Sequence, residues 1–304
     1  MMQSTRQLPL FNTGVTSHTP LAQAISPFQK YLRDEGKTSN TIIGFTSDLH
    51  LLCEYFGEEA PVGRISTSHL NKFLDWMEHG RGKPCSRKSY ARRVTTIKVF
   101  FKWLENLHAR SDNPAAAILQ RSGPAPLQSI LSLQDIHTLQ AYCQDLRAAR
   151  KPDSRPALLF NLLLLTGIKK SECMNLTLQH VDRRDVDHPL LIIKHKKKRD
   201  VYRERRIPLN REWLGMLDEY VEQYHIKDVI FPCTARNLEY VLSDAGKAAG
   251  IEGRASFEIL RWTCAVRDYL NGMDVDSLRE KMGLSRISWR ETGQKIALLA
   301  QGRV

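Results

Sequence analysis

The chain has 304 residues, of which 42% are hydrophobic, so it is long enough to form two domains, each with its own core. It contains no run of 18 apolar residues, so we expect no membrane span. Lysine and arginine number 45 against 33 acidic residues, and the net charge of +12 favours a protein that binds nucleic acid. The N-terminus lacks a basic-then-apolar signal pattern, which predicts a cytoplasmic protein.

Residues 1–19 are polar, and we expect a flexible N-terminus there. Helices with short connections follow, and they predict a helical domain over residues 20–118. Ser26 and Pro27 have the residue types of an N-cap and a first helical position, so the first helix is expected to begin there. The apolar residues of the next helix step by three and four, as an amphipathic helix requires: Ile42, Phe45, Leu49, Leu52 and Phe56.

A long helix that begins at Ser86 combines a buried apolar stripe with a strongly basic outer side. Lys88 and Arg92 lie one helical turn apart on that side, where like charges repel, and a polyanion would relieve the repulsion. We therefore predict that the helix binds DNA through four cations: Arg87, Lys88, Arg92 and Arg93. A face that is merely solvated is the alternative.

Residues 119–130 are rich in proline and glycine and predict a linker, so residues 131–304 form a second domain. In this domain an apolar helix stops at Gly167, where glycine permits a sharp bend into a second helical pattern. Glu172 lies near the start of that pattern, where the helix dipole favours an acid. The bend places the cation of Lys169 at a tight helix–helix corner.

Apolar β-prone runs at Leu190–Ile193 and Ile207–Leu209 flank a block of charged residues. This pattern predicts a β-hairpin with a basic tip, although a disordered charged loop is the alternative. We expect the lysines of the tip to contact DNA: Lys196, Lys197 and Lys198. The six cysteines form no C-x-x-C pair, so we predict reduced cysteines, no metal and no cofactor.

The order of these features resembles the tyrosine recombinases, the phage integrase family. The corner reads TGIKKSE over residues 166–172 and resembles the family's TGLRxSEL box, whose arginine grips the scissile phosphate. The TSNT of residues 38–41 and the NPA of residues 113–115 resemble motifs of the family's core-binding domain. The resemblance implies a mainly α-helical fold with a small β-hairpin or sheet. An N-terminal core-binding bundle would precede a C-terminal catalytic-type domain.

The same resemblance implies six functional positions, of which this chain keeps a minority. Arg261 keeps the arginine of the family's HxLRHT box, and Lys169 replaces the arginine of the corner but keeps its charge. Both are expected to contact a DNA phosphate. The lysine that protonates the leaving 5′ oxygen corresponds to Lys194 or Lys196, because the longer hairpin leaves two registers open.

The other three positions have lost their chemistry. Glu258 and Leu284 stand where the family has histidines, and Gly293 stands where it has the nucleophilic tyrosine. No tyrosine occurs after Tyr269. Ser285 and Ser288 are the serines that could replace the tyrosine as nucleophile, but neither has a histidine base nearby in the sequence.

A family member without its nucleophile cannot form the covalent 3′-phosphotyrosine. We therefore predict a nucleoid-associated protein that binds double-stranded DNA without cutting it, with an accessory or regulatory role in recombination, integration or transposition. An active recombinase or transposase would be its partner, and the apolar end of its last helix would pack on a second copy or on its own core. Two alternatives stay open: an active recombinase whose nucleophile comes from a partner in trans, and a protein-interaction module that has lost DNA binding.

Overall fold

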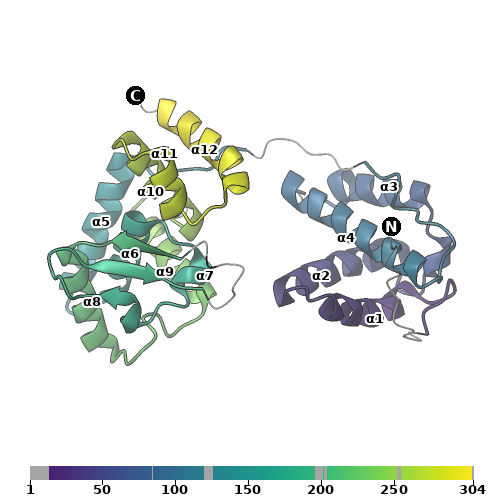
Figure 1. Cartoon of the computed structure of the whole chain (residues 1–304), viewed down its shortest axis with the longest axis horizontal. Helices are drawn as coiled ribbons and strands as arrows, with labels where there is room; N and C mark the ends of the chain where they lie inside the picture. The colour runs from purple at the N-terminus through teal and green to yellow at the C-terminus, as the bar shows by residue number, and fades with distance from the viewer. Residues whose placement is uncertain are drawn as a thin grey trace, which may run out of the picture. The chain divides into compact units, whose positions relative to one another are not determined.

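The structure is a computed structural model that describes residues 14–83, 85–119, 126–195, 201, 204–251 and 255–302. The chain divides into two compact units, residues 1–126 and 127–304, and each has its own hydrophobic core. The first unit is built from helices, and the second combines helices with a small antiparallel sheet (Figure 1). The predicted fold class is therefore confirmed. In the ranges described, no helix combines the length and the apolar composition that crossing a bilayer requires.

Four α-helices pack around the core of the first unit within the described residues. They are α1 (Leu21–Asp34), α2 (Ser39–Phe56), α3 (Thr67–Asp75) and α4 (Arg87–Asn106), with a short 3₁₀ turn at Val62–Arg64 and a π-helical turn at Trp76–Gly80. α2 packs against both α1 and α4. Aromatic rings fill the centre, where the ring of Phe28 lies 5.2 Å from those of Phe100 and Trp103, measured between centroids.

The start of α1 differs from the start that Ser26 and Pro27 indicated, so that prediction is wrong. The helix begins at Leu21, which is fully buried and whose N–H donates to the Ala60 carbonyl at 2.9 Å. Pro27 consequently lies inside the helix, where it removes one backbone hydrogen bond. Burial of the first turn outweighs this loss.

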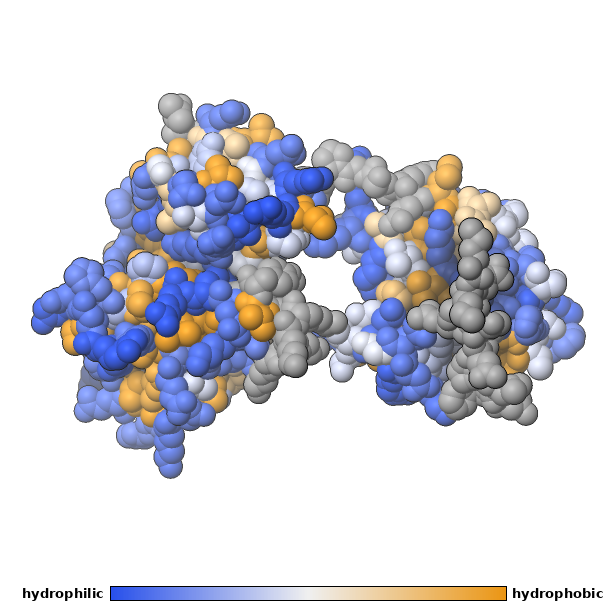
Figure 2. All heavy atoms as spheres, in the orientation of Figure 1, coloured by the Kyte–Doolittle hydropathy of each residue, from blue (hydrophilic) through white to orange (hydrophobic). Residues whose placement is uncertain are grey.

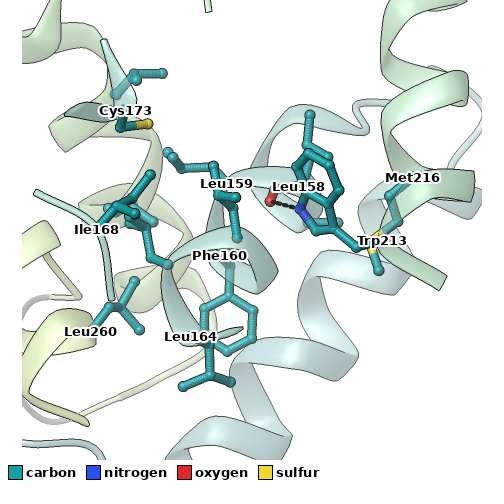
Figure 3. Close-up of a cluster of buried hydrophobic side chains, with 14 of the residues drawn as sticks. Leu158, Leu159, Phe160, Leu164, Ile168, Cys173, Trp213, Met216 and Leu260 are labelled. Carbon is teal, nitrogen blue, oxygen red and sulfur yellow. Dashed lines mark hydrogen bonds between the residues drawn. The ribbon is translucent and has the colours of Figure 1, made fainter. Parts of the chain in front are cut away.

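The second unit is organised around α6, an apolar helix whose neighbours surround it (Figure 1). Its helices are α5 (Leu133–Ala148), α6 (Arg155–Thr166), α7 (Lys170–Cys173), α8 (Arg211–Tyr224), α9 (Ala235–Ala248), α10 (Phe257–Leu270), α11 (Val275–Lys281) and α12 (Arg286–Gln301), with a 3₁₀ turn at Leu178–His180. α6 packs against α5, α8, α9 and α10, which explains why it is apolar on every side. In Figure 3 the indole N–H of Trp213 donates to the Leu158 carbonyl at 3.2 Å, so even the polar atom of this buried ring is paired.

A three-stranded antiparallel sheet stands beside these helices. Its strands are β1 (Val181–Asp182), β2 (Leu190–Ile193) and β3 (Arg205–Pro208), in the order β1-β2-β3. The predicted hairpin is confirmed as β2 and β3, whereas β1 was too short to detect. Ile193 pairs with Arg205 and Leu191 with Ile207, and the last two are both buried. Because side chains alternate along a strand, Arg205 lies on the same inward face as Ile207.

Hydrophilic side chains dominate the face of both units that Figure 2 shows, and hydrophobic areas on it are small and separate. Helix α12 docks on its own unit, because Ile296 and Ala300 are buried in a cluster with residues of α10 and α11. The opposite side of α12 exposes Ile287 and Leu298. The apolar end of the last helix therefore packs, at least in part, on its own core.

Candidate functional site

The corner between α6 and α7 is set by Gly167, which adopts a left-handed backbone with φ of +57°. A Cβ atom at this position would lie 3.1 Å from the sulfur of Met282 and 3.2 Å from that of Cys264. Glycine is therefore required by both conformation and space. After the bend, α7 runs only from Lys170 to Cys173, so the second helical pattern forms a single turn.

Glu172 lies just beyond this bend and is only 6% exposed. Its Oε2 accepts the backbone N–H of Lys169 at 2.8 Å, which caps α7. Arg205 of β3 binds the same carboxylate with both terminal nitrogens, Nη1 to Oε1 at 3.0 Å and Nη2 to Oε2 at 2.9 Å. Burial by itself raises the pKa of Glu172, but the hydrogen bonds and charge of Arg205, with those of Lys169, outweigh it and lower the pKa.

Three cations from three elements converge on the turn that joins α11 to α12. Arg205 Nε donates to the carbonyl of Lys281 at 2.7 Å, Arg261 Nη2 to that of Met282 at 2.5 Å, and Lys169 Nζ to that of Gly283 at 2.9 Å. The three acceptors are consecutive along the chain. Arg205, Arg261 and Lys169 come from β3, α10 and the N-cap of α7, so their convergence is a property of the fold.

Arg261 is held by backbone carbonyls at both terminal nitrogens, since Nη1 donates to the carbonyl of Gly167. No tyrosine hydroxyl of the described chain is among its hydrogen-bond partners. Burial is the main cause that lowers the pKa of Arg261 to about 10; the charge of Glu172 opposes this fall, and the charge of Arg205 adds to it. Even so, the group stays protonated at neutral pH.

The positions where the resemblance placed lost chemistry lie on the helices around this turn. Glu258 is exposed in the first turn of α10 and has no hydrogen bond or ion pair with any other residue that the structure describes. Leu284 follows Gly283 and packs against the cluster beneath α12. Gly293 lies within α12, where an added Cβ would approach the ring of Trp289 to 3.0 Å.

The basic hairpin is only partly described. Lys194 is exposed directly after β2, and the positions Lys196, Lys197 and Lys198 lie outside the described residues. The choice between Lys194 and Lys196 for the hairpin lysine therefore stays a prediction.

Sequence reasoning missed two residues of this cluster, Arg205 and His195. Arg205 had a usable signal, since it stands two positions before the apolar Ile207 on a strand. His195 places Nε2 at 3.6 Å from Oε1 of Glu172, and its backbone N–H donates to Oε1 of Glu204 at 2.9 Å. His195 had no comparable signal, because it lies in a run of charged residues.

Helix α4 of the first unit presents its predicted cations in two different ways. Arg87 and Lys88 are exposed at its start. Arg92 Nη2 lies 2.9 Å from Oδ1 of Asp48, and Arg93 Nε lies 3.6 Å from the same oxygen. Asp48 is 3% exposed on α2, so a buried carboxylate of the protein itself relieves part of the repulsion on α4.

The sequence also did not reveal the role of Asp48, because this residue occupies an inward position of α2. Its Oδ2 accepts the hydroxyl of Thr96 at 2.8 Å. Burial raises the pKa of Asp48, and the contacts with Thr96, Arg92 and Arg93 only reduce that rise. No group of three His, Cys, Asp or Glu side chains in the described part of the chain could hold a metal ion.

Comparison with known proteins gives the family. Residues 25–107 match the N-terminal SAM-like domain of phage integrases, and residues 117–291 match the phage integrase family. The chain is 24% identical over 269 residues to tyrosine recombinase XerD of Listeria innocua, a match that covers 84% of this chain and 87% of the relative. It is 26% identical over 293 residues to XerD of Brucella abortus, covering 87% and 90%.

Solved structures share the fold at lower identity. A lambda integrase dimer bound to a COC′ core site superposes with a TM-score of 0.72 at 17% identity, covering 99% of this chain and 83% of that one. XerH site-specific recombinase in a post-cleavage complex with a palindromic difH substrate gives 0.71 at 16% identity, covering 93% and 82%. Because the family match spans more than half of its length, the chain belongs to the phage integrase family, the tyrosine recombinases.

Proposed function

We propose that this protein binds duplex DNA without cleaving it and serves as an accessory or regulatory member of its family in DNA recombination, integration or transposition. The observation that carries the proposal is that α12 has glycine at residue 293, the position that the sequence resemblance assigns to the nucleophilic tyrosine. Without a phenol oxygen to attack phosphorus, the covalent protein–DNA intermediate has no source in this helix.

The state of the neighbouring positions supports this proposal. Lys169 replaces an arginine and therefore lacks the fork that binds two phosphate oxygens at once. Glu258 places an exposed carboxylate three residues before Arg261, where a negative charge repels a phosphate. Leu284 offers no donor. These residues lack the two histidines and the guanidinium fork that the family resemblance assigns to binding and stabilising the transferring phosphate.

Binding of DNA is supported by the net charge of +12 and by the exposed cations at the start of α4. Arg87 and Lys88 are the phosphate contacts that we propose for the first unit, because neither is held by a carboxylate of the described chain. Lys194 and the basic tip beyond it are the proposed contacts of the second unit. The lambda integrase and XerH structures that share the fold are themselves complexes with DNA.

The accessory role implies a partner, either an active recombinase or transposase or a second copy of this chain. The outer side of α12 is the surface that we propose for it. Ile287 is 81% exposed and Leu298 is 54% exposed there, whereas the inner side of the helix is already covered. Exposed apolar side chains on a helix flank are suited to a protein contact.

The experiment is a suicide-substrate assay on a duplex that the protein has selected from a random DNA pool. We expect a gel shift that weakens steeply between about 50 and 200 mM salt, as phosphate-dominated binding does. On a denaturing gel we expect no covalent adduct of this chain. An adduct overturns the proposal, and a XerD-type recombinase on its own site is the positive control for detection.

Two further outcomes separate the alternatives. If an adduct forms only after the cognate recombinase is added, size-tagged chains show which one carries the DNA. A DNA label on the partner chain agrees with the accessory role. If that cleavage also requires the Arg261 guanidinium of this chain, the result favours the alternative in which the partner supplies the nucleophile in trans. Absence of any gel shift at low salt favours the protein-interaction module instead.

A further inference from the structure

The cations of the remnant site are bound to the protein's own backbone. Lys169, Arg205 and Arg261 donate to the carbonyls of residues 281, 282 and 283, at distances from 2.5 to 2.9 Å. Those carbonyls end α11 and lead into α12. We propose that the three cations form a clamp that holds the α11–α12 turn in place.

The geometry of the turn supports this assignment. Gly283 has φ of +57°, and a Cβ at this position would lie 2.8 Å from Nη1 of Arg205. The backbone therefore approaches the guanidinium more closely than any other residue type would permit. Any larger residue here would require the Arg205 guanidinium or the turn itself to shift.

The Glu172 carboxylate completes the clamp. It fixes Arg205 through two terminal nitrogens, so Nε of the same guanidinium is left pointing at the Lys281 carbonyl. It also accepts the backbone N–H of Lys169, which holds the start of α7 and therefore the base of the Lys169 side chain. Glu172 is thus a positioning residue for two of the three cations.

The charges explain why carbonyls are the partners. Three cations and one carboxylate leave a net charge of about +2 in a half-buried site, and each backbone carbonyl presents a partial negative charge to one cation. Carbonyl partners are fixed by the fold and need no ligand. The three cations stabilise the position of α11 and α12, and this role does not depend on the function proposed above.

The test is hydrogen–deuterium exchange of the full chain, without DNA, in wild type and in Lys169→Met. Methionine keeps the length and apolar stem of lysine but cannot donate to Gly283. We expect amides in residues 278–301 to exchange at least about tenfold faster, because a hydrogen bond from a charged donor is lost. Amides of α8, which lies outside the clamp, are the internal reference and should not change.

Two variants control the result. Lys170→Met removes the next lysine, which is exposed and paired with Glu239 at 3.1 Å, and should leave exchange of residues 278–301 within twofold of wild type. Lys169→Arg keeps a charged donor and should restore most of the protection. Exchange that is unchanged in Lys169→Met, or raised equally by Lys170→Met, overturns the clamp. Failure of the wild-type gel shift would instead overturn the proposed function and leave this result standing.

Discussion

Arg205 and Glu172 form a buried, two-point ion pair between β3 and the first turn of α7. Both bonds are near 3 Å, and the side chains are 7% and 3% exposed. The pair joins the sheet to the α6–α7 corner, and through Lys281 it reaches the α11–α12 turn. One interaction therefore ties together three parts of the unit: the sheet, the α6–α7 corner and the α11–α12 turn.

Replacing Arg205 with methionine should lower the free energy of unfolding of the second unit by roughly 3–5 kcal/mol, because it leaves the Glu172 carboxylate buried without its partner. Chemical denaturation measures the change. Arg206→Met is the matched control, since its exposed side chain makes no comparable pair with any residue that the structure describes, and it should cost less than about 0.5 kcal/mol. Equal effects of the two substitutions would contradict the role of the pair. In a Glu172→Gln background the cost of Arg205→Met should fall clearly.

Glu172 also makes the second unit sensitive to acid. Its pKa is lower in the folded chain than the ordinary value of 4.5, so its stabilising contribution is present above that value and is lost as pH falls through the folded pKa. Thermal unfolding followed from about pH 3 to pH 6 should therefore show a loss of stability on the acid side. Glu172→Gln should flatten that dependence. A pH profile that is identical in wild type and variant would show that the carboxylate is not held as described.

Asp48 should act in the opposite sense in the first unit. Its pKa is higher in the folded chain than the ordinary value of 3.8, so the folded state binds the proton more tightly. Its contribution is present below the ordinary pKa and is lost as pH rises through the folded value. Asp48→Asn should remove this component. If the variant instead lost most stability relative to wild type at neutral pH, where the carboxylate is ionised, the ion pairs with Arg92 and Arg93 would dominate over burial.

The salt dependence of DNA binding should separate the exposed cations of α4 from the paired ones. Removing two phosphate contacts with Arg87→Gln and Lys88→Gln should reduce the slope of log Kd against log salt by about 2. Lys102→Gln removes a charge from the other end of the same helix, where Glu105 already lies 2.6 Å from the amine. It should change the slope by less than about 1. If wild type, the double variant and Lys102→Gln all had the same slope, the DNA would not contact the start of α4.

The sequence was sufficient for the features that depend on local periodicity. The apolar steps of α2 and the apolar runs of β2 and β3 follow from patterns of 3.6 and 2 residues. The bend at Gly167 followed from a glycine after an apolar helix. These features involve neighbours along the chain, so residue order alone carries the information.

The features that the sequence did not reveal depend on partners far apart in the chain. Asp48 interrupts an apolar face of α2, and its partners Arg92 and Arg93 are more than 40 residues later. The start of α1 was misplaced because Leu21 is fixed by Ala60, a contact outside the helix. The carbonyls of residues 281–283 carry no side-chain signal at all, so no motif could have indicated that they bind Lys169, Arg205 and Arg261.

Adding a phenol at residue 293 should not produce cleavage. Gly293→Tyr introduces a tyrosine at the position that we propose for the nucleophile, and the nearby ring of Trp289 must move by a few tenths of an ångström to admit its Cβ. Arg261 would still donate to the carbonyls of Gly167 and Met282. Glu258 would still place a carboxylate at the position that we propose for the first histidine. We therefore expect no covalent adduct from this variant on a suicide duplex.

Gly293→Phe is the control for that experiment, since it makes the same steric demand without a hydroxyl. Both variants should retain the gel shift of wild type if α12 tolerates the ring. An adduct from Gly293→Tyr, absent from Gly293→Phe, would mean that the nucleophile was the only part lost and that the cations can leave their carbonyls for a phosphate. If Gly293→Tyr forms no adduct, Glu258→His and Lys169→Arg would next be combined with it. Because these changes restore a donor and a two-point fork, they should be necessary before any adduct appears.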